Sequence, residues 1–216
     1  MTAPTETYPA LTGLDGVRHA FTLRVPELEV KTERAVALAR LDEFHAHARR
    51  ELIGEIPFVT AEQVHGREVS HVTEAANACL PAADGLITCL NNVCLGIYVA
   101  DCCAVYLVDP VRRAIGLVHS GKKGTELGIV PEAIERMRAA FGSEPRDLIV
   151  QLSACIRPPQ YETDFAAQIV TQSRLAGVQQ VFDSGLNTGA ELRRYYSYRM
   201  EQGRTGRMLA LLALHD

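Results

Sequence analysis

Three short apolar runs between residues 98 and 124 constrain the fold more than any other part of the chain. The first run ends in Asp101-Cys102-Cys103, the second ends at a turn formed by Asp109-Pro110, and the third ends on His119. Short runs that are rich in β-branched residues and bounded by turn residues are typical of buried strands. Polar groups at the ends of such strands are easily exposed, and functional sites are often built there. The pattern therefore predicts a sheet with Cys102 and His119 at strand ends.

The rest of the chain mixes predicted strands with predicted helices and contains no internal repeat and no linker-like segment. Strands are expected at residues 17–25, 58–65, 68–72, 86–89, 93–99, 148–152 and 208–214, and helices at 32–53, 125–141 and 163–175. The helix at 125–141 contains Pro131. It is therefore expected to kink or divide in two, with Pro131 at the first position of the second part. We expect one α+β domain at residues 17–216, preceded by a loose lead-in at residues 1–16.

Three of these elements carry further expectations. Residues 17–25 alternate between apolar and polar side chains, which predicts a half-buried strand that presents Arg24. The strands at 58–65 and 68–72 are expected to flank a turn at Gly66. The helix at 32–53 is expected to be capped by Thr32. Its His45 and His47 lie two residues apart and face different ways, so both are expected on the surface rather than at a metal.

The composition excludes several classes of protein. The 216 residues are 47% hydrophobic and 22% charged, which suits one globular domain. The net charge of −4 favours neither nucleic acid nor an anionic membrane as a partner. No apolar run is long enough to span a bilayer, and residues 1–9 lack the basic and apolar blocks of a signal peptide. We therefore expect a cytoplasmic protein.

The cysteines support that location, because none shows the spacing of a disulfide-stapled scaffold. The chain has six of them, all in apolar segments: Cys79, Cys89, Cys94, Cys102, Cys103 and Cys155. We expect reduced thiols. Cys103 follows Cys102 directly and points the other way on a strand, so it is expected in the core with Cys79, Cys89, Cys94 and Cys155.

His65, Cys102 and His119 are the candidate metal ligands. Catalytic zinc takes three protein ligands and keeps one position open, and imidazole and thiolate both suit this ion. The gaps, 102 − 65 = 37 and 119 − 102 = 17, match no short metal motif. From the residues alone, three alternatives remain open. In the first, the side chains are ordinary core residues. In the second, Cys102 is a metal-free nucleophile with His119 as its base and Asp101 or another polar group as the orienting group. In the third, the site binds copper.

Five short motifs occur in order along the chain. They are Gln63-Val64-His65-Gly66, Ala83-Asp84-Gly85, Ala100-Asp101-Cys102, His119-Ser120-Gly121 with Gly124, and Tyr196-Ser197-Tyr198-Arg199 with Thr205-Gly206-Arg207. With these motifs the chain resembles the YfiH family, also called the laccase-domain or multicopper polyphenol oxidase family. The resemblance extends from about His19 to the last predicted strand, which is nearly the whole chain.

The resemblance implies both a fold and an activity. The fold is a compact α+β domain with mixed sheets flanked by helices, related to the CNF-type cysteine hydrolases. His65, Cys102 and His119 match the zinc-binding residues of the family. The implied activity is phosphorolysis of adenosine, inosine, guanosine or methylthioadenosine, together with deamination of adenosine. The implied partners are a nucleoside and phosphate, and the sequence carries no signal of an oligomeric state.

The laccase name of the family can be tested by counting histidines. A multicopper oxidase needs about ten of them for its copper sites, and this chain has seven. An oxidase with copper is therefore disfavoured relative to a zinc enzyme. A metal-binding protein without catalysis is a further alternative, in which a structural zinc would require a fourth protein ligand.

The chain departs from the family in four places. The usual His-Ala-Gly-Trp-Arg-Gly is replaced by residues 119–124, HSGKKG, and the usual Gly-Pro-Cys-Ile by residues 153–156, SACI. A Cys-Thr pair near the C-terminus is replaced by Asn187-Thr188, and a glycine-rich loop is shortened to Pro26-Glu27. The metal ligands are kept while the expected substrate walls change, which indicates a divergent substrate or a loss of catalysis.

Cations near the third apolar run are the candidates for binding phosphate. Lys122 and Lys123 lie after a predicted strand and before a predicted helix, where backbone N–H groups add to their charge. The loop lacks the spacing of a Walker A motif. Arg24 and Arg199 are further anion-binding candidates, because the matching arginines of the family lie near the site.

Two more polar residues complete the predicted site. Asp101 is a candidate for orienting a metal ligand or accepting a proton. Gln63, in the first motif, is a candidate for contacting the substrate. We predict catalytic roles for Cys102, Asp101 and Arg24, and substrate or phosphate binding by Lys122, Lys123, Arg199 and Gln63.

Overall fold

Two six-stranded mixed sheets form the framework of the computed structural model, which describes residues 4–215. The first sheet has the order β1 (Thr5–Glu6), β2 (Val17–Thr22), β12 (Met208–Leu214), β7 (Cys94–Val99), β3 (Phe58–Ala61) and β5 (Ala78–Leu80). The second has the order β11 (Gln180–Asp183), β10 (Ile149–Leu152), β8 (Cys103–Asp109), β9 (Ala114–Ser120), β6 (Gly85–Thr88) and β4 (Val69–His71). The fold is the α+β arrangement with mixed sheets that the sequence predicts.

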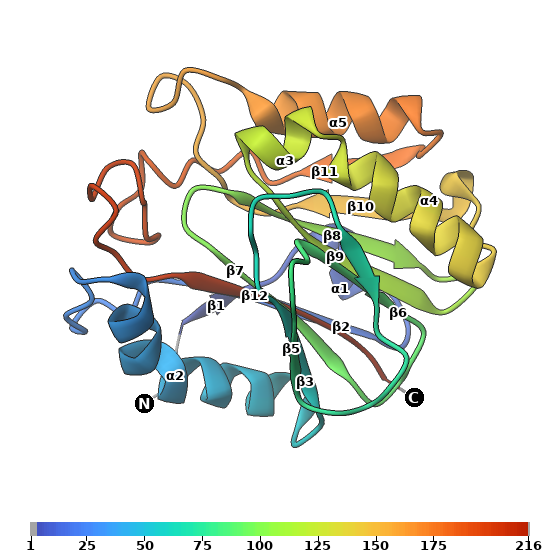
Figure 1. The fold of residues 1–216 in the computed structure, drawn as a ribbon, viewed down its shortest axis with the longest axis horizontal. Helices are drawn as coiled ribbons and strands as arrows, with labels where there is room; N and C mark the ends of the chain where they lie inside the picture. Colours follow the sequence, from blue (N-terminus) through green and yellow to red (C-terminus); the bar gives the residue numbers. More distant parts are fainter. Residues whose placement is uncertain (1–3, 216) are drawn as a thin grey trace.

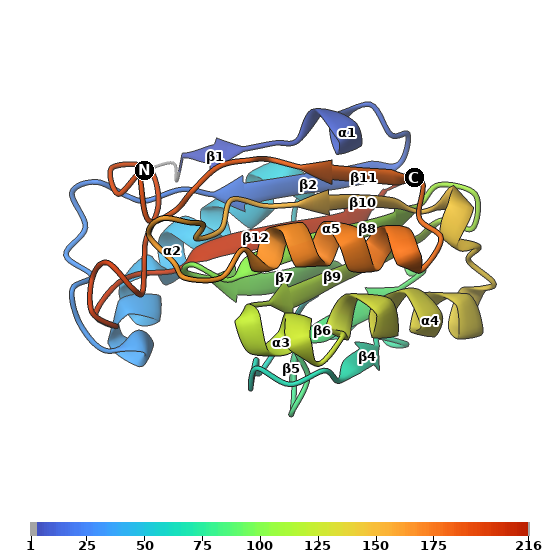
Figure 2. The same ribbon diagram turned by 90° about the horizontal axis from the view of Figure 1, so that it is seen from above.

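Helices cover the outer faces of the two sheets, so that the molecule has four layers (Figure 1). The longest helix, α2 (Arg34–Ile53), packs on the first sheet, while α3 (Lys122–Glu126), α4 (Ile129–Phe141) and α5 (Phe165–Leu175) pack together on the second (Figure 2). Two short helices, α1 (Pro9–Thr12) and the 3₁₀ helix η1 (Pro145–Asp147), complete the set. Within residues 4–215, no helix is long and apolar enough to cross a membrane.

The central strands are buried on both faces because each sheet lies between the other sheet and a helix layer. In β12, Met208 and Leu212 belong to the core between the sheets, whereas Leu209 and Leu211 pack toward α2. The sequence of a fully buried strand is a continuous apolar run rather than an alternation of apolar and polar residues. This layering explains why the apolar runs of the sequence are uninterrupted.

The same layering changes the expectation for residues 17–25. The strand β2 ends at Thr22, and only Arg18 of its six residues is exposed. The prediction of a half-buried strand was therefore wrong, because α2 covers one face and α1, together with Tyr106 of β8, covers the other. Arg24 lies beyond the strand, where its backbone N–H donates to the carbonyl of Arg194.

The chain passes from one sheet to the other at the segments that carry the candidate ligands. β3 belongs to the first sheet and β4 to the second, so residues 62–68 are a crossing and not the turn of a hairpin. Strands flank Gly66 as predicted, but the first ends at Ala61, and the two strands belong to different sheets. Residues 100–102 make a second crossing, from β7 to β8.

Two predicted helices are confirmed with small shifts in their boundaries. α2 begins at Arg34, with Glu33 rather than Thr32 at the capping position. The predicted division of residues 125–141 occurs at Gly128, whose φ of 75° is left-handed and ends the first helix. Pro131 is the third residue of α4 rather than the first. This position is tolerated because the first-turn N–H groups of a helix have no partner within the helix.

The expectation of a loose lead-in at residues 1–16 is wrong for its described part. β1 pairs with β2, and α1 buries Leu11 completely. The backbone N–H of Tyr8 donates to His19 Nε2 at 2.7 Å, which ties this segment to the sheet. Residues 1–3 lie outside the described part of the chain.

Three further side chains differ from expectation. His45 is buried with a ring centroid 5.6 Å from that of Tyr98, because its face of α2 packs on the first sheet. Cys79 and Cys89 are exposed, since one lies on the edge strand β5 and the other follows the end of β6. Cys94, Cys103 and Cys155 are buried as predicted.

Candidate metal centre

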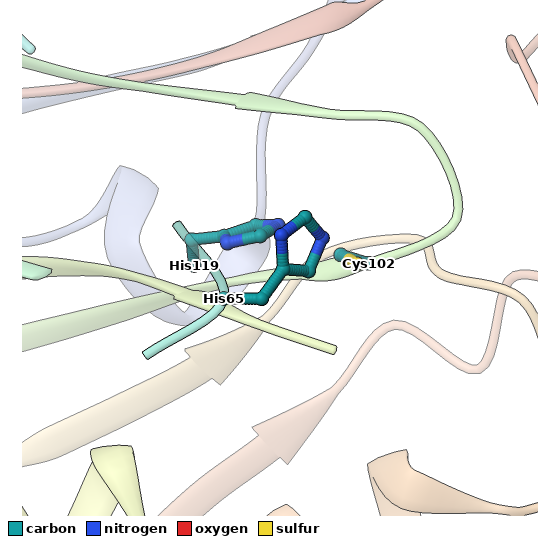
Figure 3. Close-up of side chains that lie close together, drawn as sticks. All are labelled: His65, Cys102 and His119. Carbon is teal, nitrogen blue, oxygen red and sulfur yellow. The ribbon is translucent and has the colours of Figure 1, made fainter. Parts of the chain in front are cut away.

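His65, Cys102 and His119 come together in space as the sequence predicts (Figure 3). One ligand atom from each lies within 4.8 Å of the ligand atoms of the other two. The two imidazole rings meet edge to face, with their centroids 4.8 Å apart. His119 is buried, Cys102 is partly buried and His65 is exposed, so the group opens toward solvent on the His65 side. Within residues 4–215, this is the one group of three or more His, Cys or acidic side chains placed to hold a metal.

Unusual backbone conformations place two of the three ligands. Gln63, His65 and Asp101 have φ values of 64°, 59° and 80°, in the left-handed region that non-glycine residues seldom occupy. Such residues cost of order 1 kcal/mol each and persist where the surrounding structure holds them. All three belong to the two crossing segments that carry His65 and Cys102, so these ligands are held by strained backbone.

A glycine makes room for the thiol. A Cβ atom added to Gly121 would lie 2.5 Å from Cys102 Sγ, which is closer than two such atoms can approach. Gly121 lies at the end of β9, two residues after His119. Only glycine allows this segment to pass so near the sulfur.

The carboxylate of Asp84, which lies just before β6, connects two of the ligands. Its Oδ1 accepts a hydrogen bond from His119 Nδ1 at 2.8 Å and another from the backbone N–H of His65 at 2.9 Å. Its Oδ2 accepts the backbone N–H groups of Val64 and Gly66 at 3.1 and 2.7 Å. Asp84 therefore holds the His65 loop and fixes His119 with its Nε2 free for a metal, as carboxylates behind metal-binding histidines commonly do.

Asp84 stays ionised despite its complete burial. Burial alone would raise the pKa of its carboxyl, but the hydrogen bonds from His119 and Gly66 outweigh this effect and lower the pKa. Asp84 belongs to the motif Ala83-Asp84-Gly85, but the sequence predicts no role for it. An acidic residue immediately before an apolar strand was the available signal.

The thiol and the buried imidazole stabilise one another in their charged forms. Burial alone would raise the pKa of Cys102, but the charge and hydrogen bonds of His119 and His65 outweigh it and lower the pKa to about 6. Burial alone would lower the pKa of His119, but Cys102 and Asp84 raise it to about 9. Cys102 is therefore a thiolate at neutral pH, the form that binds metals.

The three ligands lie in a cleft of about 670 Å³. Its aromatic lining residues are Tyr98, Tyr161, Phe165 and Tyr198, and its cationic ones are Arg34, Lys122, Arg199 and Arg207. The volume falls within the ~300–1,000 Å³ usual for small-molecule sites. Rings and cations together suit a ligand with an aromatic part and an anionic part.

Asp101 and Gln63 line the cleft, but their polar atoms are engaged by the protein. Asp101 accepts hydrogen bonds from Thr188 Oγ1 and from the backbone N–H of Arg199, both at 2.7 Å. Gln63 donates to the carbonyl of Tyr98 at 2.6 Å and accepts from the N–H of the same residue at 2.9 Å. Both side chains thus hold the walls of the cleft together.

The four predicted cations divide into two groups. Lys122 and Arg199 line the cleft, and both approach the carboxylate of Glu162, at 3.8 and 3.1 Å. Lys123 is exposed and does not line the cleft. Arg24 is also outside the lining.

The guanidinium of Arg24 is engaged elsewhere. It forms an ion pair with Glu201 at 2.5 Å, donates to the carbonyl of Tyr195 and lies 4.5 Å from the centre of the Tyr196 ring. Arg24 therefore fastens the loop that follows Tyr195 to the end of β2.

Sequence reasoning missed Arg34 and Arg207. Arg207 belongs to the motif Thr205-Gly206-Arg207, which was quoted without a role. Arg34 is the first residue of the helix α2. At that position, no sequence signal distinguishes an arginine that lines a cleft from one that is exposed to solvent.

Comparison with known proteins agrees with the fold and with these motifs. The family model described as multi-copper polyphenol oxidoreductase laccase matches residues 38–174 and 160–215. The chain belongs to this family, the YfiH or laccase-domain family. The resemblance inferred from the five motifs is confirmed.

Relatives within the YfiH family carry names that refer to an activity. The purine nucleoside phosphorylase YlmD of Bacillus subtilis is 29% identical over 199 residues, which cover 74% of this chain and 71% of the relative. A purine nucleoside phosphorylase of Deinococcus radiodurans is 31% identical over 181 residues, covering 73% and 70%. The family thus includes proteins named as enzymes of nucleoside chemistry.

Solved structures in the YfiH family share the fold. YlmD from Geobacillus stearothermophilus superposes with a TM-score of 0.81 at 23% identity, covering 97% of this chain and 94% of that one. YfiH from Bacillus licheniformis gives 0.77 at 24% identity and covers 92% of each chain. At these identities the likeness establishes the architecture.

Proposed function

We propose that this protein is a zinc-dependent enzyme that acts on purine nucleosides, by phosphorolysis and, for adenosine, also by deamination. The observation that carries the proposal is the group of His65, Cys102 and His119 on the wall of a cleft with aromatic and cationic lining. The names of the relatives support the substrate class.

The donor set fits zinc. Two imidazoles and one thiolate are ligands that zinc prefers, and the bond to Asp84 leaves His119 Nε2 available. Three protein ligands are typical of a catalytic zinc site, whereas a structural zinc takes four. When bound, zinc with an open position supplies a Lewis acid and lowers the pKa of water. Copper shares these ligands, but a laccase needs further histidine clusters, and residues 4–215 form none.

Phosphorolysis places three demands on the cleft. An oxygen of hydrogen phosphate forms a bond to ribose C1′ while the bond from C1′ to the purine nitrogen breaks. The departing electron pair takes up a proton, which balances the one that hydrogen phosphate loses, so the products are ribose 1-phosphate and the neutral purine. The enzyme must therefore hold phosphate, orient the nucleoside and favour the leaving base. The cations of the cleft serve the first demand, and rings such as Tyr161 and Tyr198 serve the second by stacking on the base.

The other predicted residues are proposed to position the site rather than to react. Asp101 links the Cys102 segment to Thr188 and to the backbone of Arg199. Arg24 holds the neighbouring loop through Glu201. Lys123 is retained only as a surface charge. All six cysteines are free thiols, and we propose the cytoplasm as the location because it keeps thiols reduced.

The test is the release of free purine base from adenosine, inosine, guanosine and methylthioadenosine, measured by chromatography with and without phosphate. We expect release that depends on phosphate in the wild type and falls at least about 100-fold in His119→Ala. The control is His71→Ala, which removes an exposed histidine outside the cleft. Base release from no nucleoside by a zinc-loaded wild type would refute the proposal.

A specific geometry favours a second candidate, a metal-free cysteine hydrolase or amidase. Cys102, His119 and Asp84 are arranged as nucleophile, base and orienting carboxylate, with the hydrogen bond from His119 to Asp84 already in place. The discriminating experiment is alkylation of Cys102 with iodoacetamide in protein of known zinc content. Rapid modification of zinc-free protein as isolated, with loss of ester or amide hydrolysis, would favour this candidate.

A further inference from the structure

Arg34 and Arg207 are two cations of the cleft that form no ion pair with any acidic side chain of residues 4–215. Both side chains line the cleft. Arg207 Nη1 donates to the carbonyls of Thr205 and Gly206 at 2.9 and 2.8 Å, which fixes the guanidinium and leaves its Nε and Nη2 without a partner among residues 4–215. In the same part of the chain, Arg34 makes no hydrogen bond and no ion pair. Glu33 also lines the cleft, but no ion pair joins it to either arginine.

The charges of Cys102 and Asp101 favour the charged form of Arg207, but they do not offset its burial and the neighbouring Arg34. Burial, and then the positive charge of Arg34, lower the pKa of Arg207. Arg34 is the first residue of α2, where a cation opposes the helix dipole and so weakens the helix. Arg207 is held by its hydrogen bonds to two carbonyls, and Arg34 makes no stabilising contact, so an anion between the two arginines would relieve both unfavourable terms.

The other two cations of the cleft lining differ in this respect. Lys122 and Arg199 share the carboxylate of Glu162, which already occupies the place that an anion would take. Arg199 also lies 4.6 Å from the centre of the Tyr161 ring, and its charge is partly satisfied there. An incoming anion would have to displace Glu162 from Lys122 and Arg199, whereas Arg34 and Arg207 have no paired carboxylate to displace.

We propose that Arg34 and Arg207 form the subsite for inorganic phosphate, the co-substrate of the proposed phosphorolysis. This inference rests on the proposed function and adds to it the place of the anion. Two guanidinium groups present planar pairs of N–H donors that match the oxygens of a phosphate dianion. The Tyr198 ring, 5.7 Å from Arg207 and also in the cleft lining, gives the base of a nucleoside a surface beside this subsite.

The test measures the dissociation constant of inorganic phosphate by isothermal titration calorimetry on zinc-loaded protein without nucleoside. We expect Arg34→Gln and Arg207→Lys each to raise it about tenfold or more, because each loses a charge-assisted or bidentate contact. Arg34 is exposed, so Arg34→Gln leaves the core intact. The matched control is Arg50→Gln, the same change at the other end of α2, where Arg50 faces Glu55. It should leave phosphate binding unchanged.

Three outcomes would overturn the subsite. The first is unchanged phosphate binding in both arginine variants together with weaker binding in Lys122→Gln or Arg199→Gln. The second is the absence of phosphate binding to the wild type at millimolar concentration. The third is binding of a nucleoside 5′-monophosphate, but not of free phosphate, at these arginines.

A kinetic experiment, which measures nucleoside cleavage and the KM for phosphate, distinguishes a failure of this inference from a failure of the proposed function. If phosphate binds through Arg34 and Arg207 but no nucleoside is cleaved, the function fails and the subsite stands. If nucleosides are cleaved and the KM for phosphate is the same in wild type, Arg34→Gln and Arg207→Lys, the function stands and the subsite fails. A rise in the KM for phosphate with little change in the KM for nucleoside is the expected result.

Discussion

Asp84 is the residue on which the geometry of the centre depends most. One carboxylate accepts four hydrogen bonds, one from the ring of His119 and three from the backbone of residues 64–66. A neutral amide at this place would keep the size of the side chain but would reverse part of the hydrogen bonding. The orientation of one ligand and the loop of another therefore rest on a single charge.

We predict that Asp84→Asn lowers zinc affinity by about 10–100-fold, the range usual for residues that orient metal ligands. The measurement is competition for zinc with a coloured chelator. Asp109→Asn is the control, since Asp109 is also buried and also accepts backbone N–H groups, but at the turn between β8 and β9. Equal losses of zinc affinity in both variants would mean that Asp84 acts through general stability and not through the ligands.

Gly121 gives a second prediction at the scale of one residue. Gly121→Ala introduces a methyl group 2.5 Å from Cys102 Sγ, so either the sulfur or the β9 end must move. We expect zinc content to fall well below one ion per chain while the circular dichroism of the fold is retained. Gly13→Ala is the control, because nothing lies within 4 Å of the added atom there. Full zinc content in Gly121→Ala would contradict the close packing described for this segment.

At the scale of elements, the sequence predicted which helices and strands exist better than it predicted how deeply their side chains are buried. β8, β9, β12 and α2 are all present close to their predicted ranges, because long apolar runs and helical periodicity are strong local signals. The burial of His45 was missed because helix periodicity alone does not reveal how much of a face is covered. The two crossing segments that carry His65 and Cys102 were also missed, since the pairing of strands far apart in sequence leaves no signal in a local window.

The candidate site shows the same division. His65, Cys102 and His119 were found because metal-binding residue types at strand ends are distinctive, and because the family motifs contain them. Asp84, Arg34 and Arg207 were not assigned roles, since charged residues are common on surfaces and only the fold brings these three to the cleft. Arg24 was predicted at the site but does not line the cleft, because the sequence does not show which part of the fold an arginine faces.

Two buried histidines, one on β2 and one on α2, predict a loss of stability in acid. Burial lowers the pKa of His19 and of His45 to about 4, compared with about 6.5 in an unfolded chain. Because the unfolded chain binds protons that the native state does not, stability is complete above pH 6.5 and falls as the pH drops toward 4. The loss is at most about 3 kcal/mol for each histidine.

The measurement is the free energy of unfolding in urea at pH 7.5 and pH 5.0. We expect wild type to be less stable at pH 5.0, and His45→Leu to lose less between the two values than wild type does. His71→Gln, which changes an exposed histidine, should lose as much as wild type. Equal stability of wild type at both pH values would argue against neutral buried histidines.

At the scale of the whole molecule, the centre lies where the two sheets exchange segments. The ligands come from two segments that cross between the sheets and from β9 of the second sheet, so a bound metal would connect these crossing segments to the second sheet. A ligand that binds only the native state stabilises it by an amount that grows with its concentration, about 2.7 kcal/mol at 100 times Kd. Metal binding and global stability should therefore be linked.

We predict that removal of zinc with a chelator lowers Tm by several degrees and that added zinc restores it. His119→Ala should show neither change, because it lacks a ligand. A Tm that is the same for wild type with and without zinc, in protein shown to bind zinc, would contradict the linkage between the centre and the sheets.

The most direct test of the central claim is the metal content of the purified protein, measured by elemental mass spectrometry. We predict about one zinc per chain in wild type and a loss in each of His65→Ala, Cys102→Ala and His119→Ala, with Cys89→Ala unchanged because that thiol is exposed and outside the centre. Folded wild-type protein without stoichiometric metal, even after incubation with zinc, would contradict the account and make Cys102 a candidate nucleophile.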